Sequence, residues 1–128
     1  MPMYREVKSS AQARELMPHI DGVVVMSLEG CAPCVTVWKA LELAQFAHLP
    51  RTKIQLSADD RDDRAFIRDQ GMTGFPTIIH YVNGVAGARM VGAVESDLST
   101  VANAIMDALN LPRAATPMRD PAAQVACA

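Results

Sequence analysis

Cys31-Ala32-Pro33-Cys34 lies between an apolar run at residues 23–26 and a helical pattern that follows it. Two cysteines separated by two residues, where a strand gives way to a helix, can alternate between a dithiol and a disulfide. Unpaired backbone N–H groups and peptide dipoles at a helix N-terminus stabilise a thiolate, which is the nucleophile in thiol–disulfide exchange. The stretch therefore predicts a redox-active cysteine pair.

Strand and helix patterns alternate on both sides of this stretch. Strands are predicted at residues 4–7, 23–27, 53–56, 77–82 and 88–91, and helices at 10–17, 33–47, 59–70 and from 95 or 96 onward. The early strand–helix–strand order requires parallel crossovers, whereas Asn83-Gly84 is a hairpin signal that makes the last two strands antiparallel. We therefore expect an α/β fold with a central mixed β-sheet flanked by helices on both faces.

The composition suits one compact domain. The chain has 128 residues, 50% of them hydrophobic, and a net charge of −2. The absence of a long basic run gives no support to nucleic-acid or membrane-surface binding, and no apolar stretch approaches the length of a membrane span. The first residues lack the apolar core of a secretory signal, so we expect the protein in the reducing cytoplasm. We also expect it to be a monomer. We expect a folded domain over residues 1–111 and a flexible, proline-punctuated tail over residues 112–128.

Other interpretations of the cysteines carry less support. Structural disulfides are scarce in a reducing compartment, so Cys31 and Cys34 are not expected to be purely structural. No second Cys-x-x-Cys or nearby histidine completes a zinc or iron–sulfur site, and we expect no metal and no cofactor. Glu29 is interpreted as a solvated loop carboxylate, with tuning of the nucleophile as the alternative. Cys127 is interpreted as an exposed thiol, with an intermolecular disulfide or regulation as the alternative.

Landmarks along the chain, taken together, resemble those of the thioredoxin family. They are Cys31-Ala32-Pro33-Cys34, Gly74-Phe75-Pro76-Thr77, Asn83-Gly84 and Val91-Gly92-Ala93, in the family's order and spacing. A Cys-x-x-Cys motif followed about forty residues later by a strand-opening proline is strongly specific. The resemblance covers roughly residues 4–110 and implies a thioredoxin fold with a cis peptide bond before Pro76.

The resemblance implies a role for each residue of the cysteine motif. Cys31 is expected to attack a substrate disulfide, and Cys34 to attack Cys31 in turn and free the reduced substrate. Pro33 lacks an N–H and fits the first turn of a helix. Ala32 adds no charge, and the motif is close to the Cys-Gly-Pro-Cys of thioredoxins, which favours a reductant.

The resemblance also implies a surface for substrate docking. Pro76 is expected to face the cysteine pair and to expose the backbone of Phe75, to which an extended substrate segment can hydrogen-bond. Gly74 and Gly92 are expected to keep this surface flat, and Gly30 directly precedes the nucleophile.

The chain departs from the family pattern at three positions. Val25 stands where the family carries a buried acid that assists deprotonation of the second cysteine, and Gln55 is aligned with the lysine near that acid. Their loss also removes the desolvation cost of a buried charge pair. Gly30 takes the place of a tryptophan, which Trp38 inside the helix does not replace by position.

The sequence thus predicts a protein-disulfide reductase of thioredoxin type, acting on disulfide-containing proteins and recharged by a reductase or a dithiol electron donor. One alternative is an oxidase- or isomerase-like relative of an oxidising compartment, which the missing signal segment argues against. Another is a non-enzymatic binding module or a subunit of a larger assembly, which Val25, Gln55 and Gly30 keep open. The sequence identifies neither the electron donor nor the substrate nor the redox potential.

Overall fold

The structure is a computed structural model that describes residues 4–92 and 97–111. The elements are β1 (Tyr4–Val7), α1 (Ser10–Leu16), the 3-10 helix η1 (Met17–His19), β2 (Gly22–Leu28), α2 (Ala32–Leu41), the 3-10 helix η2 (Ala44–Phe46), β3 (Arg51–Leu56), α3 (Arg61–Asp69), β4 (Thr77–Val82), β5 (Val85–Val91) and α4 (Leu98–Ala108). The predicted tail over residues 112–128, Cys127 and Ala93 lie outside the described residues.

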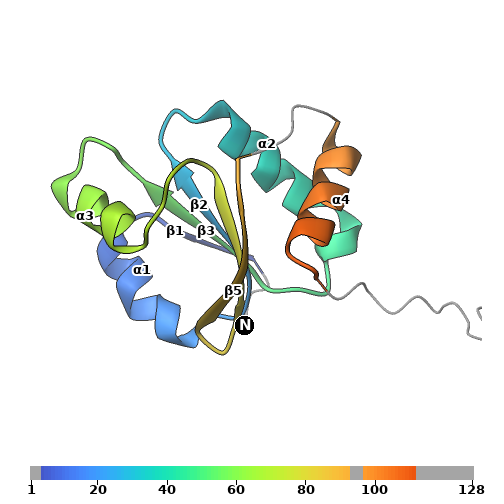
Figure 1. Cartoon of the computed structure of the whole chain (residues 1–128), viewed down its shortest axis with the longest axis horizontal. Helices are drawn as coiled ribbons and strands as arrows, with labels where there is room; N and C mark the ends of the chain where they lie inside the picture. The colour runs from blue at the N-terminus through green and yellow to red at the C-terminus, as the bar shows by residue number, and fades with distance from the viewer. Residues whose placement is uncertain (1–3, 93–96, 112–128) are drawn as a thin grey trace, which may run out of the picture.

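The strands form one mixed sheet in the order β1-β3-β2-β4-β5 (Figure 1). β3 pairs in parallel with β1 and β2, whereas β4 runs antiparallel to β2 and β5. α1 and α3 cover one face of this sheet, and α2 and α4 cover the other (Figure 1). The expected fold class, a central mixed sheet with helices on both faces, is confirmed.

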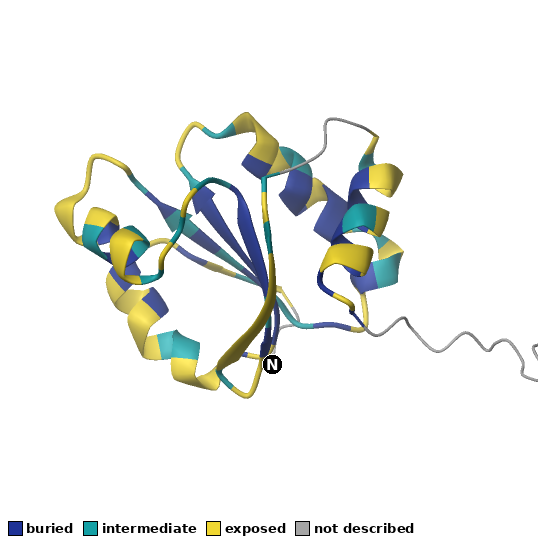
Figure 2. Ribbon diagram, viewed as in Figure 1, coloured by how far each residue is buried: buried dark blue, intermediate teal, exposed yellow. Residues whose placement is uncertain are grey.

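β2 lies at the centre of the molecule and contributes to the core on both of its faces. Successive side chains of a strand point to opposite faces. Val23 and Val25 therefore pack in the cluster formed with α2 and α4, and Val24 and Met26 pack in the cluster under α1 and α3. All four side chains are fully buried, as the dark colour of β2 shows (Figure 2). The loop that carries the cysteines thus leaves from the most deeply buried strand.

α2 ends earlier than the sequence predicts, at Leu41 instead of near residue 47. The guanidinium of Arg51, at the start of β3, donates a hydrogen bond of 2.7 Å to the carbonyl oxygen of Leu41. Leu43 then adopts an extended backbone, and the following 3-10 turn buries Phe46 completely in the α2–α4 cluster. Helical periodicity alone could not reveal these contacts from distant residues.

Other boundaries also differ from the predicted ones by a few residues, as at the start of β3, which is Arg51 instead of residue 53. β5 begins at Val85, directly after the hairpin, and the chain continues past α1 through a 3-10 turn that contains Pro18. α4 begins at Leu98, because the Asp97 carboxylate accepts the N–H of Thr100 and caps the helix there. That hydrogen bond also lowers the pKa of Asp97. None of the helices in the described ranges has the length and apolar character that crossing a membrane requires.

The hairpin between β4 and β5 depends on left-handed backbone at both turn residues. Asn83 has a φ of 51° and Gly84 a φ of 80°, as a type I′ turn requires. The Gly84 N–H donates to the carbonyl oxygen of Ile20 over 2.8 Å. A Cβ atom at Gly84 would overlap the carbonyl oxygen of Pro18. Close packing of the turn against the segment after α1 therefore excludes any side chain at this position.

We expect Gly84→Ala to lower the free energy of unfolding by about 2–4 kcal/mol, because backbone strain and steric overlap add. Gly71→Ala is the matched control, since Gly71 also has a positive φ, 66°, but open space around its Cβ position. It should cost about 1 kcal/mol, from backbone strain alone. Urea denaturation of both variants measures the difference, and equal losses would contradict the packing argument.

Asp63 joins three segments on the side of the sheet that α1 and α3 cover. It is buried, and its carboxylate accepts the N–H groups of Ser10 over 3.2 Å and of Ser57 over 2.9 Å. Its own N–H donates to Asp60, which is the N-cap of α3. The carboxylate therefore holds the start of α1 and the segment after β3 against the first turn of α3.

We expect Asp63→Asn to destabilise the chain by about 2–3 kcal/mol, because an amide cannot accept at both oxygen positions and leaves a buried N–H unpaired. The exposed neighbour Asp62 offers a control, and Asp62→Asn should change stability by no more than about 0.5 kcal/mol. Thermal and urea unfolding followed by circular dichroism test this. Similar stability of the two variants would show that the Asp63 hydrogen bonds contribute little.

Candidate redox site

Cys31 occupies the N-cap position of α2. Its backbone is extended, and its Sγ accepts the N–H of Cys34 over 3.2 Å. The sulfur therefore takes the place that a serine or aspartate oxygen holds at most helix starts. Pro33 sits in the first helical turn, where the lack of an N–H leaves no backbone bond unmade. A thiolate at Cys31 would have a backbone donor already directed at it.

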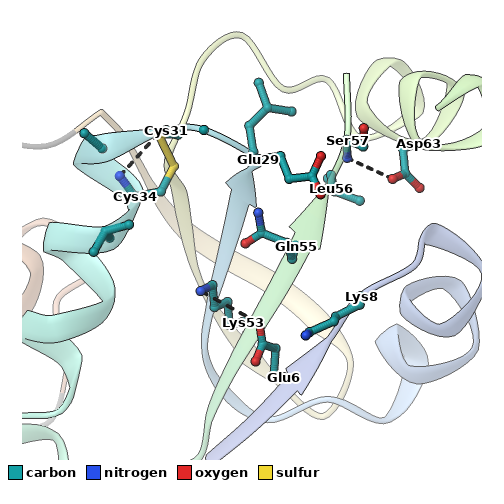
Figure 3. A pocket seen from close by; sticks show the side chains of 14 residues that line it. Glu6, Lys8, Glu29, Cys31, Cys34, Lys53, Gln55, Leu56, Ser57 and Asp63 are labelled. Carbon is teal, nitrogen blue, oxygen red and sulfur yellow. Dashed lines mark hydrogen bonds and ion pairs between the residues drawn. A yellow bond between two sulfur atoms is a disulfide. The ribbon is translucent and has the colours of Figure 1, made fainter. Parts of the chain in front are cut away.

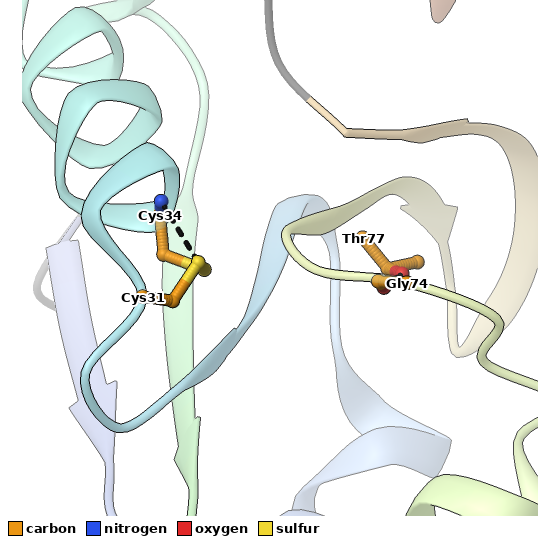
Figure 4. Close-up of a disulfide and its surroundings, with 4 residues drawn as sticks. All are labelled: Cys31, Cys34, Gly74 and Thr77. Atoms are coloured by element: carbon orange, nitrogen blue, oxygen red, sulfur yellow. Dashed lines mark hydrogen bonds between the residues drawn. A yellow bond between two sulfur atoms is a disulfide. The ribbon is translucent and has the colours of Figure 1, made fainter.

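Cys31 and Cys34 form a disulfide, with their Cα atoms 5.3 Å apart (Figure 4). Cys34 is only 3% exposed and packs into the protein, whereas Cys31 is partly exposed. Ala32, between them, is exposed. Cys31 is thus the more accessible of the two sulfurs to an incoming sulfur nucleophile or disulfide. The two sulfurs lie as near to each other as the predicted exchange chemistry requires.

The segment that contains Gly74 and leads into β4 lies near the disulfide, opposite the start of α2 (Figure 4). Thr77 is the Cα partner of Met26, close to the end of β2 from which the cysteine loop departs. The Phe75–Pro76 peptide bond is cis. The Thr77 hydroxyl donates to the carbonyl oxygen of Gly74 over 2.7 Å, which fixes the turn around the proline.

The structure brings the predicted docking residues before β4 and after β5 together. The Gly92 N–H donates to the carbonyl oxygen of Pro76 over 2.8 Å. A Cβ atom at Gly74 would lie 3.1 Å from Cγ1 of Val91, so the glycine lets the two segments approach closely. Gly30 is exposed next to Cys31. Their role in binding a substrate stays a prediction.

The strand register corrects the alignment of Gln55 with the family's lysine. Val25 is fully buried, and its Cα partner on β3 is Lys53, whereas Gln55 pairs with Ser27. The alignment was wrong because residues 53 and 55 share one face of β3, so only the register decides which of them lies beside Val25. The chain therefore keeps a lysine next to this position, although the acid is absent from it.

Lys53 makes an ion pair with a residue from the neighbouring strand. Its Nζ lies 3.8 Å from Oε2 of Glu6 on β1 and 5.8 Å from the ring centroid of Trp38. The Lys53 side chain is only 19% exposed. No local signal in the sequence points to Glu6 or Lys53, because only the parallel pairing of β1 with β3, which makes them Cα partners, brings them together.

A cavity of about 660 Å³ lies beside the disulfide (Figure 3). Both cysteines line it, together with β3 residues and charged side chains from several segments. The labelled lining residues are Glu6, Lys8, Glu29, Cys31, Cys34, Lys53, Gln55, Leu56, Ser57 and Asp63. Neither the Gly74–Pro76 turn nor Gly92 contributes to the lining. Of the predicted docking residues, Gly30 lines the cavity, whereas the turn before β4 and Gly92 lie outside it.

An aromatic pair supports α2 directly after the cysteines. The rings of Tyr4 and Trp38 have centroids 4.6 Å apart, and the Tyr4 hydroxyl donates to Oε2 of Glu42 over 2.9 Å. The pKa of Tyr4 is raised to about 12, first because burial removes water from the phenol and second because of this hydrogen bond to Glu42. The phenol consequently stays neutral near neutral pH and holds β1 to the end of α2. Within the described ranges, no group of three or more His, Cys, Asp or Glu side chains is placed to hold a metal ion.

Comparison with known proteins gives a clear result for the fold. No protein-family model matches the chain, and no curated protein matches it by sequence. Among solved structures, thioredoxin O2 from Arabidopsis thaliana is 20% identical, with a TM-score of 0.58 over 82% of this chain and 92% of that one.

Other thioredoxins give similar values. A thioredoxin from Trypanosoma brucei brucei is 18% identical, with a TM-score of 0.55 over 83% of this chain and 90% of its own. A Schistosoma mansoni thioredoxin pre-protein is 23% identical, with a TM-score of 0.52 over 82% of this chain and 97% of its own. Sheet order, helix placement and the cysteine pair at the start of α2 agree with this likeness. The chain has the thioredoxin fold.

Proposed function

We propose that the chain is a thiol–disulfide oxidoreductase that reduces protein disulfides through Cys31 and Cys34. The observation that carries this proposal is the position of the Cys31 sulfur. It caps α2, receives the N–H of Cys34 and is bonded to a buried partner sulfur. A partly exposed nucleophile with a buried resolving thiol next to it suits a reaction that passes through a mixed disulfide.

The reaction begins with the protein in its dithiol form. The Cys31 thiolate attacks one sulfur of the substrate disulfide, so that a bond to Sγ of Cys31 forms and the substrate S–S bond breaks. The other substrate sulfur leaves as a thiolate and takes up a proton. The N–H of Cys34 lies 3.2 Å from the Cys31 sulfur and stabilises its negative charge before attack.

The second step restores the disulfide of the protein. Cys34 loses its proton, its thiolate attacks Sγ of Cys31, and the remaining substrate sulfur leaves as a thiolate. Two electrons have then passed from the dithiol to the substrate. Because Cys34 is 3% exposed, an external disulfide does not compete with Cys31 for it. A thiol donor must afterwards return the protein to the dithiol form.

We further propose that protein substrates dock around Pro76, which is itself buried, on the surface formed by Gly30, Gly74, Phe75 and Gly92. Phe75 is half-buried and belongs to the turn before β4. An extended substrate segment can pair with exposed backbone there, as in other cases of strand addition. Gly30 and Gly92 have open space at their Cβ positions, so the backbone of a substrate can come close.

Insulin reduction in the presence of dithiothreitol tests the proposal. We expect Cys31→Ser to abolish catalysis, because the nucleophile is lost, and Cys34→Ser to stall after the first step and accumulate a mixed disulfide through Cys31. Turbidity measures catalysis, and mass spectrometry without reduction identifies the trapped adduct. Cys127→Ser is the matched control and should retain full activity. Equal activity of the wild type and all three variants would refute the assigned roles.

A further inference from the structure

The cavity gives the disulfide a second approach, which shares Gly30 with the proposed docking surface but has no lining residue from the Gly74–Pro76 turn or Gly92. Cys31 and Cys34 line it on one side, and Gln55 of β3 lies in the middle of the lining (Figure 3). The volume of about 660 Å³ falls in the range of pockets for small molecules. A molecule the size of an amino acid or a short peptide fits such a space, whereas a folded protein with an internal disulfide does not.

Charges of both signs surround this cavity, and some of them already have partners. The carboxylate of Asp63 accepts two backbone N–H groups, and Glu6 is paired with Lys53. Lys8 and Glu29 also line the cavity. Both are exposed, and neither has a side-chain hydrogen bond or ion pair with any other described residue. The cavity thus offers one ammonium and one carboxylate to a ligand.

From these features we propose that the cavity binds a small thiol bearing both a carboxylate and an ammonium group, and that this thiol returns the disulfide to the dithiol form. The ligand's carboxylate pairs with Lys8 and its ammonium with Glu29. Its sulfur then approaches Cys31, the more exposed of the two cysteines. The inference rests on the proposed function, for which it supplies the class of electron donor.

The reaction consumes two equivalents of the thiol. The first thiolate attacks Sγ of Cys31, the Cys31–Cys34 bond breaks, and its electron pair stays on Cys34, which takes up a proton. A second thiolate attacks the ligand sulfur of this mixed disulfide and releases Cys31 as a thiolate, which the N–H of Cys34 stabilises. The protein disulfide has gained two electrons and one proton and has become the Cys34 thiol and the Cys31 thiolate, while two small thiols have become one small disulfide and the second proton passes to solvent.

The test compares four thiols as reductants of the oxidised full-length protein. Free L-cysteine carries both charges, cysteamine only the ammonium, 3-mercaptopropionate only the carboxylate, and 2-mercaptoethanol neither. Each rate is divided by the rate of the same thiol with bis(2-hydroxyethyl) disulfide, which corrects for intrinsic reactivity. Acid quenching, alkylation and mass spectrometry follow the reduction. We expect the normalised rate of L-cysteine to exceed that of 2-mercaptoethanol at least about threefold and to saturate with concentration.

Two variants assign the charges separately. Lys8→Gln should lower the normalised rates of L-cysteine and 3-mercaptopropionate by about twofold to fivefold and leave cysteamine unchanged. Glu29→Gln should lower those of L-cysteine and cysteamine and leave 3-mercaptopropionate unchanged. Ratios between thiols on one protein cancel any change in the reactivity of the disulfide itself. Lys39→Gln and Glu15→Gln alter exposed charges outside the cavity and should change none of the ratios.

The inference would be overturned if the normalised rates of all four thiols coincided, or if each variant changed the normalised rates of all four thiols by the same factor. Dithiothreitol on the same preparations separates this failure from failure of the proposed function. If dithiothreitol reduces Cys31–Cys34 and insulin is then reduced, only the cavity proposal has failed. If the dithiol form leaves insulin intact, the proposed function has failed, and the thiol ratios still report whether the cavity selects charged thiols.

Discussion

The hydrogen bond from the N–H of Cys34 to the sulfur of Cys31 is the contact on which the rest of the site depends. It makes one cysteine the cap of α2 and the other a buried residue of its first turn. β2, buried on both faces, holds the loop before Cys31 in place, and α2 packs against the same cluster as β2. The fold thus exposes one sulfur and buries its partner beside it.

The disulfide borders two surfaces of different character. On one side lies the turn before β4, which hydrogen bonds from Thr77 and Gly92 hold in place. On the other lies a cavity with charges of both signs, in which Lys53 and Glu6 form an ion pair. The proposed function requires that an oxidised substrate and a reductant meet Cys31 in turn. Under our proposals, the docking surface and the cavity would let a large partner and a small one reach this sulfur from different sides.

Local signals in the sequence predicted the element order and the cysteine site, because each of these features depends on neighbouring residues. Ser9 caps α1, and Asn83-Gly84 forms the hairpin, as their types indicate. The end of α2 and the position of Lys53 were not predictable in this way. The first depends on Arg51 reaching back to Leu41, and the second on the register between β2 and β3. The docking roles of Gly74, Phe75 and Gly92 and the interpretation of Cys127 as an exposed thiol remain predictions.

The unequal reactivity of the two thiols is the central claim, and selective alkylation tests it most directly. The reduced Cys127→Ser protein is treated with less than one equivalent of iodoacetamide at neutral pH, and peptide mapping locates the label. We expect Cys31 to be labelled first, because it is partly exposed and its thiolate receives a backbone N–H. Equal labelling of the two cysteines, or faster labelling of Cys34, would contradict it.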